Sequence, residues 1–176
     1  AGTGLMTRGG VDITGKQNVV GVDPSQGMLG EAKKAVTAPL VRGRAEALPF
    51  RSERFDMLSM GFALRHVPDL GIAFREYFRI LKPGGRIILL ETPRPETRFG
   101  RWFVKTHFQR VLPWMARITF RNEPAQLLMK FYWDTIDQCV PPDTILAVLR
   151  KTGFVDVKLQ RTYLMINEYT ATRPLK

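Results

Sequence analysis

The amino-acid sequence predicts an α/β fold, a Rossmann-like doubly wound architecture with a mostly parallel sheet. Short apolar runs alternate along the chain with segments of helical periodicity, which is the order of elements in such folds. The first four apolar runs are rich in Val, Ile, Leu and Met and lack polar alternation, as expected of parallel strands that are covered on both faces. Because 176 residues with 44% hydrophobic content can bury one core, we expect a single domain over residues 1–176.

Strands and helices alternate over most of the chain. The sequence predicts strands over residues 18–22, 40–43, 55–60, 86–91, 155–160 and 163–171. It predicts helices where apolar residues recur at helical spacing, over residues 25–36, 70–81 and 143–152. Ser25 can cap the first of these helices. Pro83, Gly84 and Gly85 are expected to end the second helix and turn the chain into the next strand.

Residues 97–133 interrupt this alternation with an aromatic and basic insertion, which we expect to be helical with a break near Pro113. Such insertions commonly lie over the carboxyl ends of the strands, where ligands bind in these folds. An apolar stripe with cations beside it is formed at helical spacing by Val104, Phe108, Val111, Met115 and Ile118. A basic amphipathic helix of this kind predicts contact with an anionic membrane surface, although a lid over the site or a helix that covers the core would have the same pattern.

The formal net charge of +11 favours anionic partners, such as nucleic acid, acidic lipid or a polyanionic cofactor. A generally Arg-rich composition would give the same charge without such a partner. No apolar run approaches the roughly 20 residues that span a bilayer, so we expect a cytoplasmic protein, peripheral to the membrane if the insertion binds it. The single cysteine, Cys139, suits a reducing compartment, and His66 and His107 lack carboxylates at ligand spacing, so no metal is expected.

Two short segments near the start have the pattern of a nucleotide-type binding site. Gly2 and Gly4 allow a backbone turn to approach a ligand closely before a helix begins. The apolar run that follows ends at Asp23, roughly 20 positions after this turn, the spacing at which a dinucleotide-type fold places a carboxylate on ribose. Its two oxygens can accept from both vicinal ribose hydroxyls, although an aspartate that only caps the helix from Ser25 would give the same pattern.

Three further segments carry a family resemblance: GRAEALPF at residues 43–50, FDMLSMGFALRHVPD at 55–69 and ILKPGGRIILLE at 80–91. Together with the glycine turn and Asp23 they resemble the consecutive motifs of class I S-adenosylmethionine-dependent methyltransferases, specifically the UbiE type of ubiquinone and menaquinone biosynthesis. The resemblance implies S-adenosyl-L-methionine as cofactor. It implies Gly2 and Gly4 against the methionine part and Asp23 on the ribose. Ala45 and Glu46 would lie against the adenine.

Two departures from the family pattern bear on this cofactor site. The strand and acidic residue that precede the glycines in relatives do not occur in the sequence, so we expect the sheet to lack its usual first strand. Arg44 stands where many relatives carry Asp or Asn to accept a hydrogen bond from the adenine amine, and arginine cannot accept one. The resemblance also implies Met28 on the adenine ring or its pocket wall, although core filling suits a methionine at this position equally well.

Arg65 and His66 follow the strand at 55–60, at the ligand end of the predicted sheet. The resemblance implies that this pair activates the substrate. Arg65 would stabilise a developing phenolate, and His66, where relatives more often have Asn, would take or relay the phenolic proton. A surface salt bridge for Arg65 and a backbone-bonded His66 are the structural alternatives.

The resemblance implies C-methylation of a prenylated quinol or a related lipophilic phenol. Two alternatives remain: methylation of another lipophilic small molecule, and a non-catalytic subunit with a cofactor fold in a quinone-synthesis assembly. Nucleic acid is not expected as the substrate, because the strand at 55–60 leads into Ser59-Met60-Gly61-Phe62 rather than an Asn-Pro-Pro-Tyr-like base-flipping motif.

Overall fold

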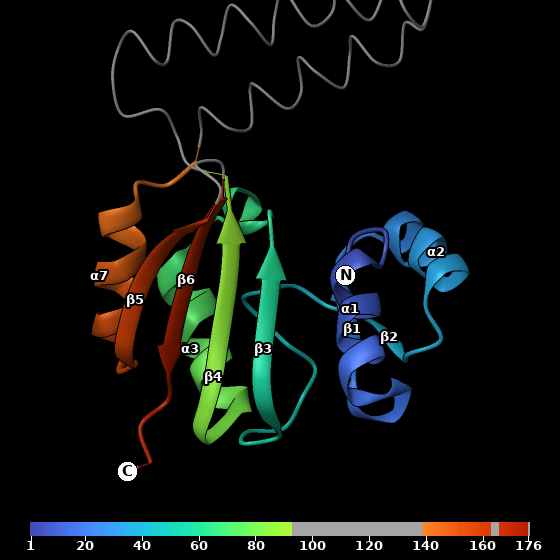
Figure 1. Cartoon of the computed structure of the whole chain (residues 1–176), viewed down its shortest axis with the longest axis horizontal. Helices are drawn as coiled ribbons and strands as arrows, with labels where there is room; N and C mark the ends of the chain where they lie inside the picture. Colours follow the sequence, from blue (N-terminus) through green and yellow to red (C-terminus); the bar gives the residue numbers. More distant parts are fainter. Residues whose placement is uncertain (93–138, 163–165, 176) are drawn as a thin grey trace, which may run out of the picture.

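The computed structural model describes residues 1–92, 139–162 and 166–175, and the strands of these ranges form two sheets (Figure 1). One is a parallel pair of β1 (Gly21–Asp23) and β2 (Leu40–Arg42). The other has the order β3-β4-β6-β5, with β3 (Phe55–Gly61), β4 (Leu81–Glu91), β5 (Val155–Thr162) and β6 (Ile166–Thr172). The insertion expected over residues 97–133 lies outside the described residues.

The connections explain the strand directions. The helix α3 (Leu70–Ile80) carries the chain from the end of β3 back to the start of β4, so these two strands pair in parallel. The strands β5 and β6 pair antiparallel, and β6 also pairs antiparallel with β4. The α/β class predicted from the alternation of apolar runs is confirmed.

The remaining helical segments are α1 (Leu5–Thr14), the 3-10 turn η1 (Lys16–Asn18), α2 (Gln26–Ala35), the 3-10 turn η2 (Leu64–His66) and α7 (Pro142–Thr152). The Ser25 hydroxyl accepts the amide of Met28 at 3.3 Å and so caps α2 as predicted. The three predicted helices agree with the structure to within one residue at each end. Within the described ranges, no helix combines the length and the apolar character needed to cross a bilayer.

Two strand predictions were wrong at their first residues. The strand expected from residue 18 begins only at Gly21, because η1 extends to Asn18 and the pairing with β2 starts where Gly21 lies opposite Leu40. The strand expected from residue 86 begins at Leu81 and includes the Pro-Gly-Gly segment. Gly84 donates its amide to the carbonyl of Arg173 at 2.9 Å, and Arg173 donates to the carbonyl of Gly85 at 2.8 Å, so a distant segment extends the strand.

The main hydrophobic core lies on one face of the four-stranded sheet, where α3 and α7 pack side by side (Figure 1). Ile87 and Leu89 point into it from β4, and both are fully buried. Phe74 of α3 and Leu149 of α7 meet them from the helical layer and are also fully buried. Alternate residues of β4 and the residues at helical spacing along α3 therefore pack into the same hydrophobic core.

Gly4 lies where the start of α1 packs closely against the end of α2. It precedes α1 in a left-handed conformation with φ of 96°, and a Cβ atom there would lie 3.2 Å from Val36 Cγ1 and 3.5 Å from Ala32 Cβ. The missing side chain thus serves both the backbone conformation and the close approach of the two helices.

We therefore expect Gly4→Ala to destabilise the fold by about 1–2 kcal/mol, because it adds left-handed strain to a steric contact. Gly9→Ala, in an exposed position of α1 where a Cβ meets nothing within 4 Å, is the matched control. It should raise stability by about 0.5–1 kcal/mol through helix propensity. Chemical denaturation of both variants measures the difference, and equal shifts would contradict the role assigned to Gly4.

Candidate active site

Three chain segments meet at Asp23, the last residue of β1. Its Oδ2 accepts the backbone amide of Gly2 at 2.8 Å, and its Oδ1 accepts the amide of Ser25 at 2.9 Å. Its carbonyl accepts the amide of Gly43 at 3.2 Å. The glycine turn, the start of α2 and the residues after β2 are thereby held around one aspartate, whose side chain is 15% exposed.

The predicted adenine segment follows Gly43 as a tight turn. Ala47 donates its amide to the carbonyl of Arg44 at 3.1 Å, and the two residues form an isolated bridge. The Arg44 side chain extends into solvent, with its Nε 3.6 Å from Oε2 of Glu46. Ala45 is half-buried and packs against the main core. Arg44 is therefore a partner of Glu46 on the outside of the turn.

The carboxylate of Glu76 and the guanidinium of Arg79, both on α3, anchor the next residues of this segment. Glu76 Oε2 accepts the amide of Leu48 at 3.1 Å and pairs with Arg79 Nη2 at 2.8 Å. Arg79 in turn donates to the carbonyl of Leu48 at 3.2 Å and to that of Phe50 at 2.8 Å. The hydrogen bond from Arg79 lowers the pKa of Glu76 below its usual value. We call these two side chains the α3 clamp.

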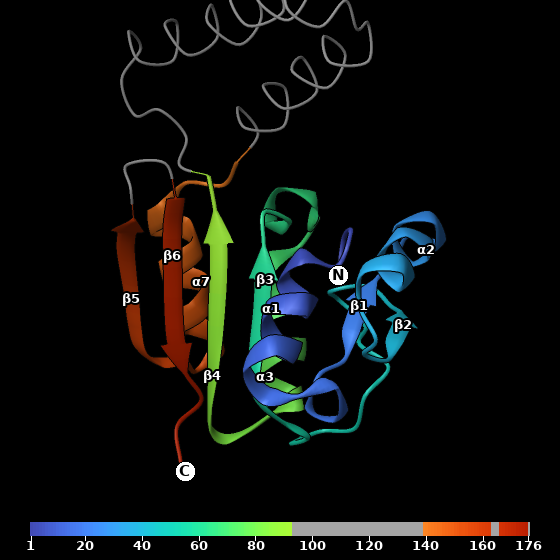
Figure 2. The ribbon, with the colours of Figure 1, turned by 45° about the vertical axis from the view of Figure 1, so that its right-hand side comes forward.

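Arg65 of η2, the turn seen above β3 in Figure 2, forms a buried ion pair with Glu91, the last residue of β4. Arg65 Nη1 lies 2.7 Å from Glu91 Oε1, and the two side chains are 9% and 4% exposed. The amide of Thr92 donates to the same oxygen at 3.1 Å. Glu91 continues the inward positions of Ile87 and Leu89, so a carboxylate occupies a site on the core-facing side of β4. Arg65 therefore forms a buried ion pair and not the surface salt bridge that was the structural alternative.

Asn167 and Tyr169 extend this pair from β6. Asn167 stands directly opposite Glu91 in the antiparallel register, so the two side chains lie on the same face of the sheet. Its Nδ2 lies 3.2 Å from the Tyr169 hydroxyl, and burial raises the pKa of Tyr169. Within the described residues, three buried side-chain atoms have no hydrogen-bond partner: Arg65 Nε, Glu91 Oε2 and Asn167 Oδ1.

His66 follows Arg65 on the same 3-10 turn but is exposed. Its backbone amide donates to the carbonyl of Ala63 at 3.0 Å. Among the residues that the structure describes, no three His, Cys, Asp or Glu side chains are grouped so that they could hold a metal ion.

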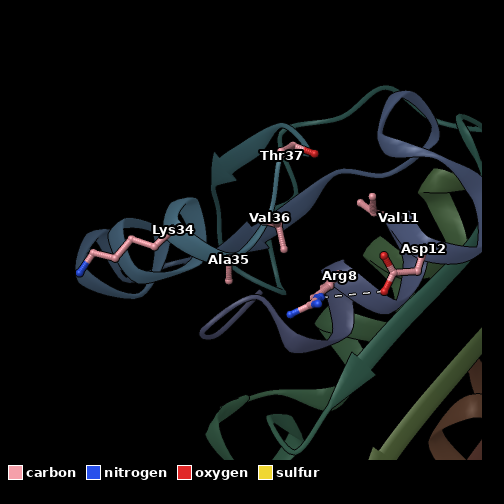
Figure 3. A pocket seen from close by; sticks show the side chains of 7 residues that line it. All are labelled: Arg8, Val11, Asp12, Lys34, Ala35, Val36 and Thr37. Carbon is pink, nitrogen blue, oxygen red and sulfur yellow. Dashed lines mark ion pairs between the residues drawn. The ribbon is translucent and has the colours of Figure 1, made fainter.

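A separate hollow of about 340 Å³ lies between α1 and the end of α2 (Figure 3). Arg8 and Asp12 face each other at its edge, with Arg8 Nε 4.0 Å from Asp12 Oδ2, and both side chains are largely exposed. Its other lining residues are Val11, Lys34, Ala35, Val36 and Thr37. Since none of the predicted site residues lines this hollow, it is distinct from the candidate site.

Comparison with known sequences identifies the family. A profile of the ubiE/COQ5 methyltransferase family matches residues 1–168. The chain belongs to this family. The demethylmenaquinone methyltransferase of Staphylococcus saprophyticus is 40% identical over 147 residues, which cover 81% of this chain and 61% of that protein. That of Lactococcus lactis is 32% identical over 153 residues, which cover 81% of this chain and 58% of that protein. The chain thus spans about three fifths of the length of these relatives.

Solved structures agree with this family at the level of the fold. Phosphoethanolamine N-methyltransferase 2 of Haemonchus contortus, in complex with S-adenosyl-L-methionine, aligns with a TM-score of 0.70 at 17% identity, over 98% of this chain and 47% of that one. A SAM dependent methyltransferase from Aquifex aeolicus aligns with a TM-score of 0.69 at 12% identity, over 98% of this chain and 78% of that one. The Rossmann-like methyltransferase fold predicted from the sequence is confirmed.

The structure of this ubiE/COQ5 family chain brings only some of the predicted residues together. Gly2 bonds directly to Asp23, and the turn with Ala45 and Glu46 is linked to Asp23 through Gly43. Gly4 is buried between α1 and α2. Met28 lies in the first turn of α2 and is 45% exposed, so it does not fill the core.

Sequence reasoning missed Glu91, Asn167 and the α3 clamp. Glu91 has a local signal, because it follows Ile87 and Leu89 at the period of two that marks the inward face of the strand. Asn167 has none, since its importance comes from the register of β6 against β4. The clamp depends on backbone groups about 28 residues from Glu76 in the chain, as the Leu48 contact shows.

The clamp makes a pH-dependent contribution to stability. Because the folded-state pKa of Glu76 is lowered, its stabilisation is present above the usual value of 4.5 and is lost as the pH falls through the folded-state pKa. We expect Glu76→Gln to lower the free energy of unfolding by ~1 kcal/mol at neutral pH, a modest loss because solvent screens the partly exposed pair. The loss should become smaller as the pH drops below 4.5. Denaturation at several pH values measures this. Glu31→Gln, which breaks an exposed Glu31–Lys34 pair on α2, should show almost no change, and an equal loss in both variants would refute the clamp.

Proposed function

We propose that this chain is an S-adenosylmethionine-dependent methyltransferase that C-methylates a prenylated quinol or a related lipophilic phenol. Membership of the ubiE/COQ5 methyltransferase family and the likeness to demethylmenaquinone methyltransferases support the reaction class. The observation that carries the proposal is the meeting of the glycine turn, the start of α2 and the segment after β2 at Asp23. These are the segments whose sequence pattern predicted a cofactor site.

The residues at this meeting point fit the proposed cofactor. A carboxylate offers about four lone-pair positions. The Gly2 amide and, at 3.4 Å, the Ala1 amine donate to Oδ2 of Asp23, whereas the Ser25 amide alone donates to Oδ1, so Asp23 can still accept from a ribose hydroxyl. A Cβ at Gly2 would meet nothing within 4 Å, which leaves its backbone open to a ligand. Met28 presents an exposed apolar side chain in the first turn of α2, five residues after Asp23, and is suited to an adenine ring. Ala45 and Glu46 would complete the adenine side, and Gly4 would hold the turn that faces the methionine part.

Arg65 and His66 are the proposed groups for activating the phenol. Bound S-adenosyl-L-methionine supplies the electrophilic methyl group, so the chain's own residues have to orient the acceptor, exclude water and stabilise charge on its oxygen. Arg65 is held almost fully buried by Glu91, which suits the stabilisation of oxygen charge in a dry site. His66 follows it on the same turn and is exposed.

Cofactor binding tests the proposed function directly. We expect the chain to bind S-adenosylmethionine or S-adenosylhomocysteine and Asp23→Ala to weaken this by about tenfold or more, because charge-assisted bonds to ribose are lost. Isothermal titration calorimetry measures both affinities. Asp12→Ala, an exposed aspartate on α1, is the control and should bind like the unmodified chain. No binding by the unmodified chain would favour the non-catalytic subunit, and full affinity in Asp23→Ala would remove Asp23 from the site.

We also propose that the basic insertion brings the protein to anionic membranes, where a polyprenyl acceptor resides. Sedimentation with anionic liposomes should weaken with salt, and it should weaken further in a variant with glutamine at Arg98, Arg101, Lys105 and Arg110, since each surface cation contributes about 1 kcal/mol of screened attraction. The control removes as many positive charges from α1, η1 and α2, with glutamine at Arg8, Lys16, Lys33 and Lys34. Equal loss in both variants would indicate a non-specific charge effect, and no sedimentation at low salt would refute membrane binding.

A further inference from the structure

Arg65, Glu91 and Asn167 form a polar cluster with unused hydrogen-bonding capacity inside the protein. The pair between Arg65 and Glu91 uses one nitrogen and one oxygen, so Arg65 Nε and Glu91 Oε2 have no partner within the described residues. Asn167 donates to Tyr169 and leaves Oδ1 without a partner in the same described part of the chain. Each of the three side chains is at least nine-tenths buried. Buried polar atoms without partners are costly, so their gathering at one place indicates a ligand site.

The types of the unused atoms define what the cluster can bind. It offers one N–H donor and two oxygen acceptors, and the charges of Arg65 and Glu91 cancel. An anion would meet two unshielded acceptor oxygens, and an ammonium group could not accept from Arg65 Nε. A hydroxyl group fits, because it can donate to a carboxylate oxygen while it accepts from a guanidinium N–H.

We propose that Glu91 is the proton acceptor for the phenolic hydroxyl of the methyl acceptor. This inference rests on the proposed methyltransferase function. The O–H bond of the acceptor breaks, its proton passes to Glu91 Oε2, and the electron pair stays on the phenolate oxygen. That oxygen remains hydrogen-bonded to Arg65 Nε, and its charge increases the electron density on the ring carbon that is to be methylated.

The transfer moves charge within the site without adding to it. Before the step the site holds a guanidinium, a carboxylate and a neutral hydroxyl; after it, the site holds a guanidinium, a neutral carboxylic acid and a phenolate. The net charge is unchanged, which matters because burial penalises any gain of net charge. Protonation of Glu91 also releases the charge of Arg65 from its partner at the moment when the phenolate needs it.

His66 is the competing proton acceptor, and the geometry favours Glu91. Glu91 lies in the buried cluster with a free carboxylate oxygen, whereas His66 is exposed on the turn beside it. In the described part of the chain, Glu91 pairs with Arg65 of η2 and interacts electrostatically with Tyr169 of β6. Tyr169 in turn interacts with Cys139, which precedes α7, and with Arg161 of β5. Burial raises the pKa of Tyr169, so the Tyr169 hydroxyl keeps its own proton.

The test uses Glu91→Gln and two soluble quinol or naphthol acceptors, one weakly acidic and one already ionised at the assay pH. If Glu91 takes the proton, the variant should lose about 100-fold or more of its rate on the weakly acidic acceptor, the scale of a general base. The loss on the ionised acceptor should be below about tenfold, because no proton has to be removed. Asp56→Asn, which removes an exposed carboxylate at the far end of β3, is the control and should retain the rate on both acceptors.

A second measurement uses only the unmodified chain and requires no methyl transfer. A nitronaphthol, whose phenol and phenolate forms absorb at different wavelengths, is titrated with the unmodified chain below the solution pKa of the probe. Bound probe that absorbs as phenolate supports the transfer, and bound probe that stays a phenol overturns it. The proposal is also overturned if Glu91→Gln loses the same factor in rate on both acceptors. It is overturned as well if only His66→Asn, and not Glu91→Gln, methylates the ionised acceptor at a nearly normal rate while it is slow on the weakly acidic one. A chain that binds no S-adenosylmethionine and methylates neither acceptor would instead refute the proposed function.

Discussion

The carboxylate of Asp23 holds together a part of the molecule that has little regular structure of its own. β1 and β2 contain three residues each, and two short parallel strands supply few hydrogen bonds. Asp23 adds side-chain bonds to the amides of Gly2 and Ser25, and its backbone adds one to Gly43. Because the same oxygens keep unused lone pairs, the group that fixes the local fold is also suited to fix a ribose. Structure and proposed binding therefore depend on one side chain.

The four-stranded sheet carries a different constraint, the buried pair of Arg65 and Glu91. Replacement of a buried ion pair by well-packed apolar residues is often neutral or stabilising, so stability alone does not account for a carboxylate on the inward face of β4. The atoms left without partners in the described region make the cluster costlier still. Features that lower stability are expected at sites where function requires them. The Arg65–Glu91 pair lies at the carboxyl ends of the parallel strands β3 and β4, where ligands bind in such folds.

Features that depend on neighbouring residues in the chain could be predicted from the sequence. The Ser25 cap and the three predicted helices follow from local hydrogen bonding and helical spacing. Features that depend on distant segments could not be predicted in this way. The early start of β4 results from the pairing of Leu81 with Phe55 and from the bonds of Gly84 and Gly85 to Arg173. The cluster around Glu91 needs the register of β6. No periodicity in a single stretch of sequence encodes which residue of another strand will lie opposite.

The two polar centres lie on different sheets, so their relative position depends on what joins those sheets. One link is α1, where Met6 Cγ would lie only 3.1 Å from a Cβ at Gly61, which shows how closely this helix approaches the end of β3. The other is the segment from β2 to β3, which the α3 clamp fixes at Leu48 and Phe50. Methyl transfer requires donor and acceptor to be aligned to within about 1 Å, and a shift of that size can cost about 100-fold in rate. The α3 clamp and the packing at Gly61 involve none of the residues proposed to bind cofactor or acceptor, yet they lie on the two links between the sheets that carry Asp23 and Arg65. We therefore expect changes at these contacts to affect the reaction more than the stability of the fold.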